Sequence, residues 1–389
     1  MLALVPFKMF AQQNPSVIVG RLDIAIRPII SLKGDTDFTD IDFLKETLKD
    51  KELVGLGEVT HGTAEVFNYK DRLVRFLVVN LGYRAIAFES DFMAIEKMDN
   101  YITGKADSIV YLSGTAIMMS NAPMIGWLRR YNQGRPELDK VHIYGLESRN
   151  YTNIFTKLLS VIPDLDKMER LMMEEYLSRP FNSVLTRQES QGIKSMLSRF
   201  QSVKLPALER QYFDMLQQLF AYGNKLSNRD SYMAKNAQWI KERVKDNKLI
   251  VWAHNGHLEK VGSGNYPTLG THLDKKYASK YYLIGTDFNS GKIYVNVFTA
   301  RNKPLSGFQP YPFAGVKSEK WYEYFFTQCR YKSFILDIDI ASKDPILKRF
   351  LAQRLLFRSI GALSIPEGQK ISISENFDLI VYFDKTTSI

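Results

Sequence analysis

The sequence predicts an α/β protein with a mostly parallel mixed sheet flanked by helices, and a large helical insertion that forms a second lobe over a deep cleft. Three observations support this fold class. Four short apolar runs are each followed by polar residues, as in buried parallel strands whose carboxyl ends meet at a ligand-binding edge. In the segment between the first run and the second, apolar residues recur at helical spacing. A longer helical stretch separates the third run from the fourth.

The four predicted strands deliver acids and histidines to one edge of the sheet. In chain order, the strands and the polar residues that follow them are 53–56 with Glu58 and His61, 85–88 with Glu89, 141–146 with Glu147, and 249–253 with His254 and His257. Because the carboxyl ends of parallel strands lie side by side, we expect these side chains to converge on one crevice.

The chain between the first two strands has the pattern of a crossover helix. Apolar residues recur at helical spacing from 63 to 80, and Leu81-Gly82-Tyr83 supplies a stop before the next strand. This helix carries Lys70. Strand, helix and strand together form a βαβ unit of ordinary size, which requires a parallel sheet.

The rest of the chain divides by its periodicity. We predict an N-terminal segment at 1–34, an α/β catalytic core at 35–150 and 247–389, and a helical insertion lobe at 151–246. The carboxyl part returns to apolar runs that are expected to complete the sheet, and these runs are 281–285, 293–297, 333–336 and 379–382.

Composition fits an enzyme-sized globular protein. The chain has 389 residues, of which 45% are hydrophobic and 24% charged, enough to bury a large core. Its net charge of +10 is dispersed along the chain, and the sequence has no motif that binds a groove of DNA or RNA. We therefore predict no nucleic-acid partner. No apolar run is long enough to span a bilayer, so we predict no membrane partner. The single cysteine excludes an internal disulfide, and nothing in the sequence predicts an oligomeric state.

The amino terminus resembles the tail of a secretory signal. Met1–Ala11 is largely apolar and ends in a small residue before the polar Gln12 and Gln13, but it has no basic start and Lys8 interrupts it. We predict a cytoplasmic location. Export to the periplasm, with the segment as a signal remnant, is the alternative.

Two glycine-flanked motifs hold three of the five histidines and indicate a hydrolytic site. The first is Gly57-Glu58-Val59-Thr60-His61-Gly62-Thr63, and the second is Trp252-Ala253-His254-Asn255-Gly256-His257. A neutral imidazole is the commonest general base near pH 7, and glycines let a substrate approach the backbone closely.

These motifs resemble those of the erythromycin esterase family. The family pattern of Gly-Glu-x-x-His-Gly, an acid after the next strand, and Ala-His-Asn-x-His matches Glu58, His61, Glu89, His254 and His257. Further similarity lies in 127–132, which includes Arg129, in Tyr144-Gly145-Leu146 before an acid, and in 229–236. The chain departs from the family in having Glu147 where relatives often have Asp, and Lys70 where they often have Arg.

The resemblance implies hydrolysis of a macrolide lactone, such as that of erythromycin, and hence macrolide resistance. It implies His61 as the base that activates water, with Glu58 or Glu89 orienting its ring. His254 and His257 become candidates for polarising the carbonyl or protonating the leaving oxygen. Lys70, Glu147 and Arg129 become candidate substrate-binding residues. The expected partner is a small lactone, with no cofactor and no metal.

Three alternatives remain open. The first is a hydrolase of another ester or lactone, and the second is a metal hydrolase. The third is a non-catalytic protein that binds haem or a metal on the same fold. His61, His254, His257 and a glutamate would be a plausible zinc ligand set. The His-Glu-x-x-His helix that is diagnostic of many zinc hydrolases is absent from the sequence.

Overall fold

The computed structural model describes residues 14–35, 37–109, 121–147, 151–158, 166–179, 186–222, 226–262, 266–300 and 303–389. Of the predicted N-terminal segment 1–34, the possible signal remnant, residues 1–13 lie outside these ranges and residues 14–34 are described. Within them, no helix is both long and apolar enough to cross a membrane.

A mixed sheet organises the described residues. Nine strands follow the order β1-β8-β11-β6-β2-β5-β3-β4, with β7 paired to β6. The pairs that join β11, β6, β2, β5, β3 and β4 are parallel, whereas β1, β8 and β7 pair antiparallel. This confirms the predicted α/β fold with a mostly parallel mixed sheet. The strands are β1 (Arg27–Pro28), β2 (Leu53–Glu58), β3 (Ala85–Asp91), β4 (His142–Glu147), β5 (Leu249–His254), β6 (Tyr281–Ala300), β7 (Lys303–Phe313), β8 (Ser333–Asp337) and β11 (Leu379–Thr386); β9 (Leu355–Arg358) and β10 (Gly368–Ile371) form a separate hairpin.

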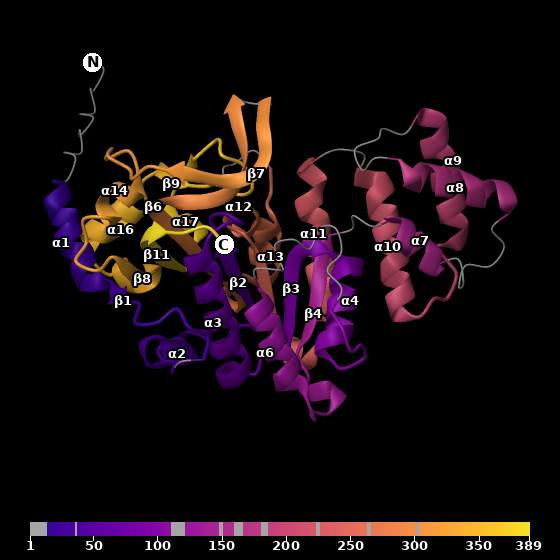
Figure 1. Cartoon of the computed structure of the whole chain (residues 1–389), viewed down its shortest axis with the longest axis horizontal. Coiled ribbons are helices and arrows are strands. Elements are labelled where there is room, and N and C mark those ends of the chain that lie inside the picture. Colours follow the sequence, from indigo (N-terminus) through magenta and orange to yellow (C-terminus); the bar gives the residue numbers. More distant parts are fainter. Residues whose placement is uncertain are drawn as a thin grey trace, which may run out of the picture.

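Helices cover both faces of the sheet (Figure 1). Those described are α1 (Pro15–Ala25), α2 (Leu44–Leu48), α3 (Ala64–Leu81), α4 (Phe92–Ile102), α6 (Ala122–Asn132), α7 (Tyr151–Leu158), α8 (Lys167–Ser178), α9 (Arg187–Phe200), α10 (Ala207–Tyr222), α11 (Leu226–Lys241), α12 (Asn255–Leu258), α13 (Leu269–Tyr277), α14 (Tyr322–Phe326), α15 (Ile338–Ala341), α16 (Pro345–Leu351) and α17 (Ile373–Asn376). The predicted crossover helix is α3, and it ends where Gly82 adopts a left-handed conformation with φ 72°.

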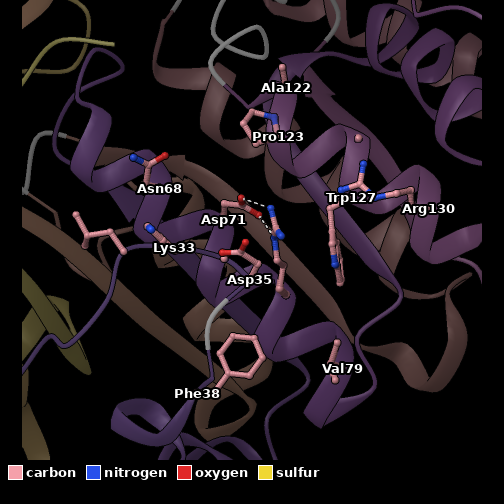
Figure 2. A pocket seen from close by; sticks show the side chains of 14 residues that line it. Lys33, Asp35, Phe38, Asn68, Asp71, Val79, Ala122, Pro123, Trp127 and Arg130 are labelled. Atoms are coloured by element: carbon pink, nitrogen blue, oxygen red, sulfur yellow. Dashed lines mark hydrogen bonds and ion pairs between the residues drawn. The ribbon is translucent and has the colours of Figure 1, made fainter.

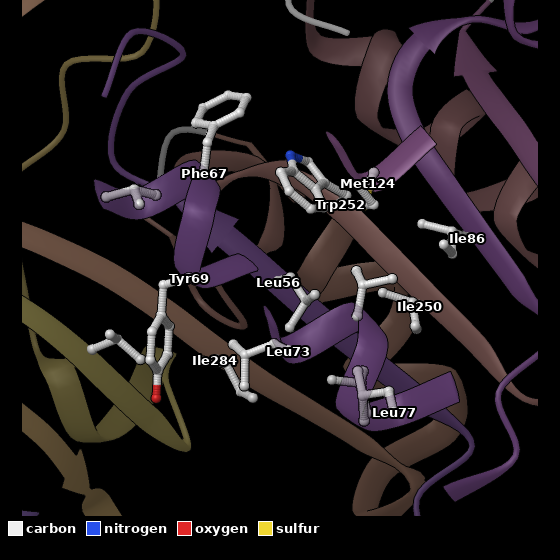
Figure 3. Close-up of a cluster of buried hydrophobic side chains, with 14 of the residues drawn as sticks. Leu56, Phe67, Tyr69, Leu73, Leu77, Ile86, Met124, Ile250, Trp252 and Ile284 are labelled. Carbon is white, nitrogen blue, oxygen red and sulfur yellow. The ribbon is translucent and has the colours of Figure 1, made fainter. Parts of the chain in front are cut away.

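The strands alternate their side chains between two apolar layers. On one face, α3 and α6 pack against the strands (Figure 3), and the side chains that meet there include Leu56, Leu73, Leu77, Ile86, Met124, Ile250 and Ile284. On the other face α1, α11, α13, α14 and α16 pack against the alternate strand residues, among them Leu53, Ala87 and Val251. Burial on both faces fixes the register, because a shift by one residue would exchange the two layers.

The predicted helical insertion contains a hydrophobic cluster of its own. Residues of α7, α8, α9 and α10 pack together, with Phe92 and Met93 of α4 at its border. These four helices lie at one end of the molecule, beyond α4 and α11 (Figure 1). Helix α11, which belongs to the same stretch of sequence, instead buries Met233, Ala237 and Ile240 in the core of the sheet. It therefore brings its first turns close to the strand ends.

Two of the four strands predicted in the carboxyl part are one longer strand, and β7, β9 and β10 are additional strands. The runs at 281–285 and 293–297 belong to one strand, β6, although Asn289-Ser290-Gly291 between them has the composition of a turn. Gly291 does not form a turn between two strands. A Cβ there would lie 2.2 Å from the carbonyl oxygen of Thr386 in the neighbouring strand, so glycine permits close approach of β11.

Candidate active site

The carboxyl ends of four adjacent strands gather the polar residues that the sequence places there. Strands β2, β5, β3 and β4 are neighbours in the sheet, and Glu58 at the end of β2 is paired in register with His254 at the end of β5. Glu89 lies near the end of β3 and Glu147 ends β4. A parallel arrangement therefore presents these groups on one edge.

Glu58 holds the side chains of His61 and Lys70 at the same time. Its Oε1 lies 2.6 Å from His61 Nδ1, and its Oε2 accepts a hydrogen bond of 2.5 Å from Lys70 Nζ. Glu58 and Lys70 are buried, and the Lys70 ammonium lies 4.0 Å from the centre of the Trp252 ring. With Nδ1–H donated to Glu58, the unprotonated nitrogen of a neutral His61 is Nε2, which makes no hydrogen bond to any described residue.

Burial and neighbouring charges shift the pKa values of Glu58, His61 and Lys70 in opposite directions. Burial alone would raise the pKa of Glu58, but the Lys70 and His61 charges outweigh it and lower that pKa to about 2. Burial lowers the pKa of Lys70 to about 8, although Glu58 opposes the shift. Burial also opposes charge on His61, yet the hydrogen bond to Glu58 leaves the His61 pKa raised above its ordinary value. The geometry thus favours an ionised carboxylate beside an imidazole ready to take a proton.

His254 has both ring nitrogens engaged by the backbone. Its Nε2–H donates to the carbonyl oxygen of Val59 at 3.0 Å, and its Nδ1 accepts from the N–H of Gly256 at 3.1 Å, which caps α12. Burial and the nearby His61 lower the pKa of His254 to about 4, consistent with a neutral ring. This ring has no free nitrogen to offer a substrate in this arrangement.

Arg229 of α11 joins the acids of β3 and β4. Its Nε donates to Glu147 Oε2 at 2.9 Å, its Nη2 donates to both Glu147 and Glu89, with 2.8 Å to Glu89 Oε1, and its Nη1 lies 2.7 Å from His257 Nε2. The other oxygen of Glu89 accepts the backbone N–H of His254 at 2.9 Å. His257 and Arg229 hold the pKa of Glu89 well below its ordinary value in spite of burial. One guanidinium therefore links three strand ends.

His257 lies between carboxylates and a guanidinium. Its Nδ1 contacts both oxygens of Asp230, at 2.9 and 3.0 Å, and its Nε2 lies 3.2 Å from Glu89 Oε1. Burial opposes a charge on His257, but Glu89 and Asp230 overcome it and raise the pKa to about 10, with Arg229 acting in the opposite direction. Because Nε2 faces the donor Arg229 and the acceptor Glu89, this ring can hold or release a proton there.

The structure brings together seven of the eight residues that the sequence singled out, and these are Glu58, His61, Lys70, Glu89, Glu147, His254 and His257. Arg129 is not among them. Its Nη1 donates to the carbonyl oxygens of Tyr101 and Ala106, at the C-terminal end of α4, and its guanidinium lies over the Tyr101 ring. Helix α4 starts at the site and runs away from it, so Arg129 stabilises that far end and does not reach the cluster.

Two members of the site were missed by sequence reasoning. Arg229 and Asp230 begin the segment 229–236, which shares the family resemblance, but the sequence assigns neither of them a role. Asp230 is buried, binds His257 and accepts the backbone N–H of Leu269 at 3.0 Å. The family resemblance of the segment 229–236 points to this region, but nothing in the helix pattern assigns the two residues to the site.

A separate cavity lies on another side of α3 (Figure 2). It has a volume of about 770 Å³ and is lined by one stripe of α3, by α6 and by the loop before α2. In it Arg75 donates two hydrogen bonds of 2.7 Å to Asp71 and lies over the Trp127 ring. None of the predicted site residues lines this cavity.

No group of three or more His, Cys, Asp and Glu side chains in the described ranges is arranged to hold a metal ion. Cys329 is buried, and burial raises the pKa of its thiol to about 12. The chemistry that the cluster offers is that of imidazoles, carboxylates, a lysine and an arginine.

Comparison with known proteins agrees with this architecture. The family model described as erythromycin esterase matches residues 78–386. The erythromycin esterase type II of Escherichia coli is 23% identical over 332 residues, covering 71% of this chain and 78% of that protein. A Bacillus cereus protein of known structure superposes with a TM-score of 0.80 at 23% identity, covering 97% of this chain and 99% of its own. A mutant of the erythromycin esterase EreC in its open conformation superposes with a TM-score of 0.69 at 17% identity, covering 93% and 98%. The chain belongs to the erythromycin esterase family.

Proposed function

We propose that the protein is a carboxylic ester hydrolase that opens the lactone ring of macrolide antibiotics such as erythromycin and so gives macrolide resistance. One observation carries this proposal. His61 is held through Nδ1 by the buried Glu58 at 2.6 Å, while Nε2 has no partner among the described residues. A general base needs one nitrogen fixed and the other free.

In the proposed reaction, His61 Nε2 removes a proton from water as the water oxygen attacks the lactone carbonyl carbon. The C–O bond to the ring alkoxide then breaks, and the alkoxide takes a proton, leaving a carboxylic acid and a hydroxyl. The acid loses its proton to the group that protonated the alkoxide, and His61 releases the proton from water to solvent. Glu58 stabilises the imidazolium that forms on His61. Arg229 supplies positive charge for the oxyanion, and His257, whose pKa is raised and whose Nε2 can hold or release a proton, donates a proton to the leaving oxygen.

His254 has a supporting role in this proposal. The sequence offered it as a group that polarises the carbonyl, but its two nitrogens are bound to Val59 and Gly256. We assign it to holding the loop that carries His61. Lys70 and Glu147 likewise act by holding Glu58 and Arg229, which leaves substrate contact to other groups.

The comparisons support a large apolar substrate, and the helices of the insertion are placed where they could border it. The family name and the erythromycin esterase of E. coli indicate macrolides. Helices α7 to α10 have their own hydrophobic cluster beside α4, which begins at the site. We propose that these helices form the second lobe and one wall of a cleft for the macrocycle.

The test is mass spectrometry of erythromycin incubated with the purified protein, with and without a chelator. The expected result is a gain of one water in both tubes, lost in His61→Ala and retained in His272→Ala, a histidine on α13 outside the cluster. A gain that disappears with the chelator would replace the proposed mechanism with a metal-dependent one. Hydrolysis of other esters, without any change in erythromycin, would refute the macrolide assignment.

A further inference from the structure

A loop from the carboxyl part of the chain covers the turn that carries His61. Residues 359–363, called here the clamp loop, follow β9 directly. The backbone N–H groups of Ile360 and Gly361 both donate to the Val59 carbonyl oxygen, at 3.2 and 3.0 Å. The same oxygen accepts from His254 Nε2 at 3.0 Å, so a single carbonyl between Glu58 and His61 is held by three donors.

The clamp loop also forms a hydrogen bond with the backbone of His61. The Gly361 carbonyl oxygen accepts the backbone N–H of His61 at 3.3 Å and the hydroxyl of Thr60 at 2.8 Å. Gly361 has a φ of 59°, the left-handed conformation that favours glycine. On its other side the loop is fixed to β6, because the Ala362 carbonyl oxygen accepts from the N–H of Asn296 at 2.8 Å.

Arg358, immediately before the clamp loop, is a buried arginine whose guanidinium is fixed by several hydrogen bonds. It is 1% exposed, and its guanidinium donates to the carbonyl oxygens of Asn289, at 3.1 and 2.6 Å, and of Ala314, at 2.6 Å. The rings of Phe288, Phe313 and Trp321 surround it, with centroids 5.1 to 5.9 Å from the guanidinium carbon. None of these partners belongs to the proposed catalytic cluster.

Two buried acids complete the anchor. The Arg358 backbone N–H donates to Glu323 Oε1 at 2.7 Å, and the Glu323 carboxylate lies near enough to Asp287 for its charge to raise the Asp287 pKa. Both acids are fully buried, and burial holds the pKa of Asp287 well above its ordinary range. The charge of Arg358 acts on Asp287, and its Nη1 also donates to Glu367 Oε2 at 3.3 Å, so carboxylates on two sides balance the buried guanidinium.

We propose that the clamp loop, anchored by the buried guanidinium of Arg358, positions His61 against Glu58 for proton abstraction. Gly361 binds the backbone N–H of His61 and Arg358 binds backbone carbonyl oxygens, so both act through the loop and are positioning residues. The inference rests on the proposed function for its kinetic consequence. Its structural consequence, the geometry of the hydrogen bond between His61 Nδ1–H and Glu58, can be measured without any substrate.

The first test compares two left-handed glycines. Gly361→Ala places a methyl group 3.5 Å from His254 Nε2, while Gly82→Ala, at φ 72° after α3, places one in open space. Both carry the same backbone strain. In the parent, the short hydrogen bond to Glu58 gives the Nδ1 proton of His61 a strongly downfield NMR signal, assigned by its loss in His61→Gln. Gly361→Ala should weaken or shift this signal, and Gly82→Ala should leave it unchanged.

The second test compares two buried arginines. Arg358→Lys removes the forked contacts of the anchor, and Arg72→Lys does the same for an arginine on α3 that is also 1% exposed and is held by Asp40 and the Asp37 carbonyl oxygen. Only Arg358→Lys should change the His61 signal. We expect kcat/KM per folded molecule to fall by about tenfold to 100-fold in Gly361→Ala and Arg358→Lys, because a displacement of about 1 Å costs about that much. KM should stay within about twofold of the parent.

The outcomes separate the two proposals. If the variants at 358 and 361 change the His61 signal no more than their controls do, the positioning role is wrong, whatever the substrate. If the signal changes as expected but neither the parent nor any variant hydrolyses a lactone, the positioning role stands and the proposed function fails. A rise in KM with unchanged kcat would instead make the clamp loop a substrate-binding element and overturn the inference.

Discussion

Glu58→Gln tests the site most directly, because it keeps the shape of the side chain and removes its charge. In the parent, Glu58 binds His61 and Lys70 while almost completely buried. A glutamine cannot stabilise the imidazolium that forms when His61 takes a proton from water. Loss of such a carboxylate typically lowers kcat by about 1,000-fold to 10,000-fold, and we expect kcat/KM to fall within that range.

The same substitution has a cost in stability that depends on pH. The pKa of Glu58 is about 2 in the folded protein and ordinarily 4.5, so folding favours the ionised form by about 3 kcal/mol at pH 7. Glutamine mimics the protonated form and should lower the free energy of unfolding by about that amount. Because the folded-state pKa is depressed, this contribution is full above pH 4.5 and is lost as the pH falls toward 2. The difference between parent and variant should therefore narrow in acid.

The assay is urea unfolding from about pH 7 down to about pH 3, beside hydrolysis followed by mass spectrometry. Glu259→Gln is the matched control. Glu259 is also buried, but burial raises its pKa to about 8, so at pH 7 an amide replaces a largely neutral group. We expect it to change stability by less than about 1 kcal/mol and to leave the rate within about twofold of the parent. Retention of near-parental hydrolysis by Glu58→Gln would refute the role of Glu58. A stability difference that does not narrow in acid would refute the charge argument.

Three further predictions concern pH and the arginine network. The pH profile of kcat/KM should rise through a midpoint above 6.5, because the base must be unprotonated and the folded environment raises the pKa of His61; a midpoint below 6.5 would contradict this. Lys70, with a pKa of about 8, loses its charge as the pH rises, so the parent rate should fall above pH 8. Lys70→Arg should retain activity there, and a parallel fall in both proteins would exclude Lys70 as the cause. Arg229→Lys keeps the charge but cannot span two carboxylates and an imidazole, so kcat should fall by about 10-fold to 100-fold in steady-state kinetics; a change in KM alone would instead assign Arg229 to substrate binding.

The parallel strands could be predicted because each combines two independent signals. At 53–56 and 249–253, an apolar run of strand length ends abruptly in acids or histidines, and the structure has β2 and β5 there. A buried strand needs apolar residues on both faces, and ligand-binding groups are tolerated only where the strand leaves the core. The convergence of Glu58 with His254 follows from parallel pairing alone.

The contribution of α11 could not be predicted in this way. Arg229 and Asp230 lie in a helix whose sequence is mainly polar, where charged residues usually face solvent. Only the packing of α11 against β4 and α13 turns both of them toward the strand ends. Local periodicity does not specify which neighbour a helix face meets, so a residue supplied from a distant helix is visible only in three dimensions.

The three histidines show why residue type and motif do not fix a chemical role. All three follow strand ends in glycine-containing segments, yet they differ in which groups engage their two ring nitrogens. His254 has no free nitrogen, since Val59 and Gly256 engage both, and its pKa falls to about 4. His257 shares one nitrogen between opposing charges, and its pKa rises to about 10. His61 keeps Nε2 free among the described residues while a carboxylate fixes the other nitrogen. A base that works near neutral pH needs that last arrangement, because a ring with no free nitrogen cannot reach the water and a ring that stays protonated cannot accept its proton.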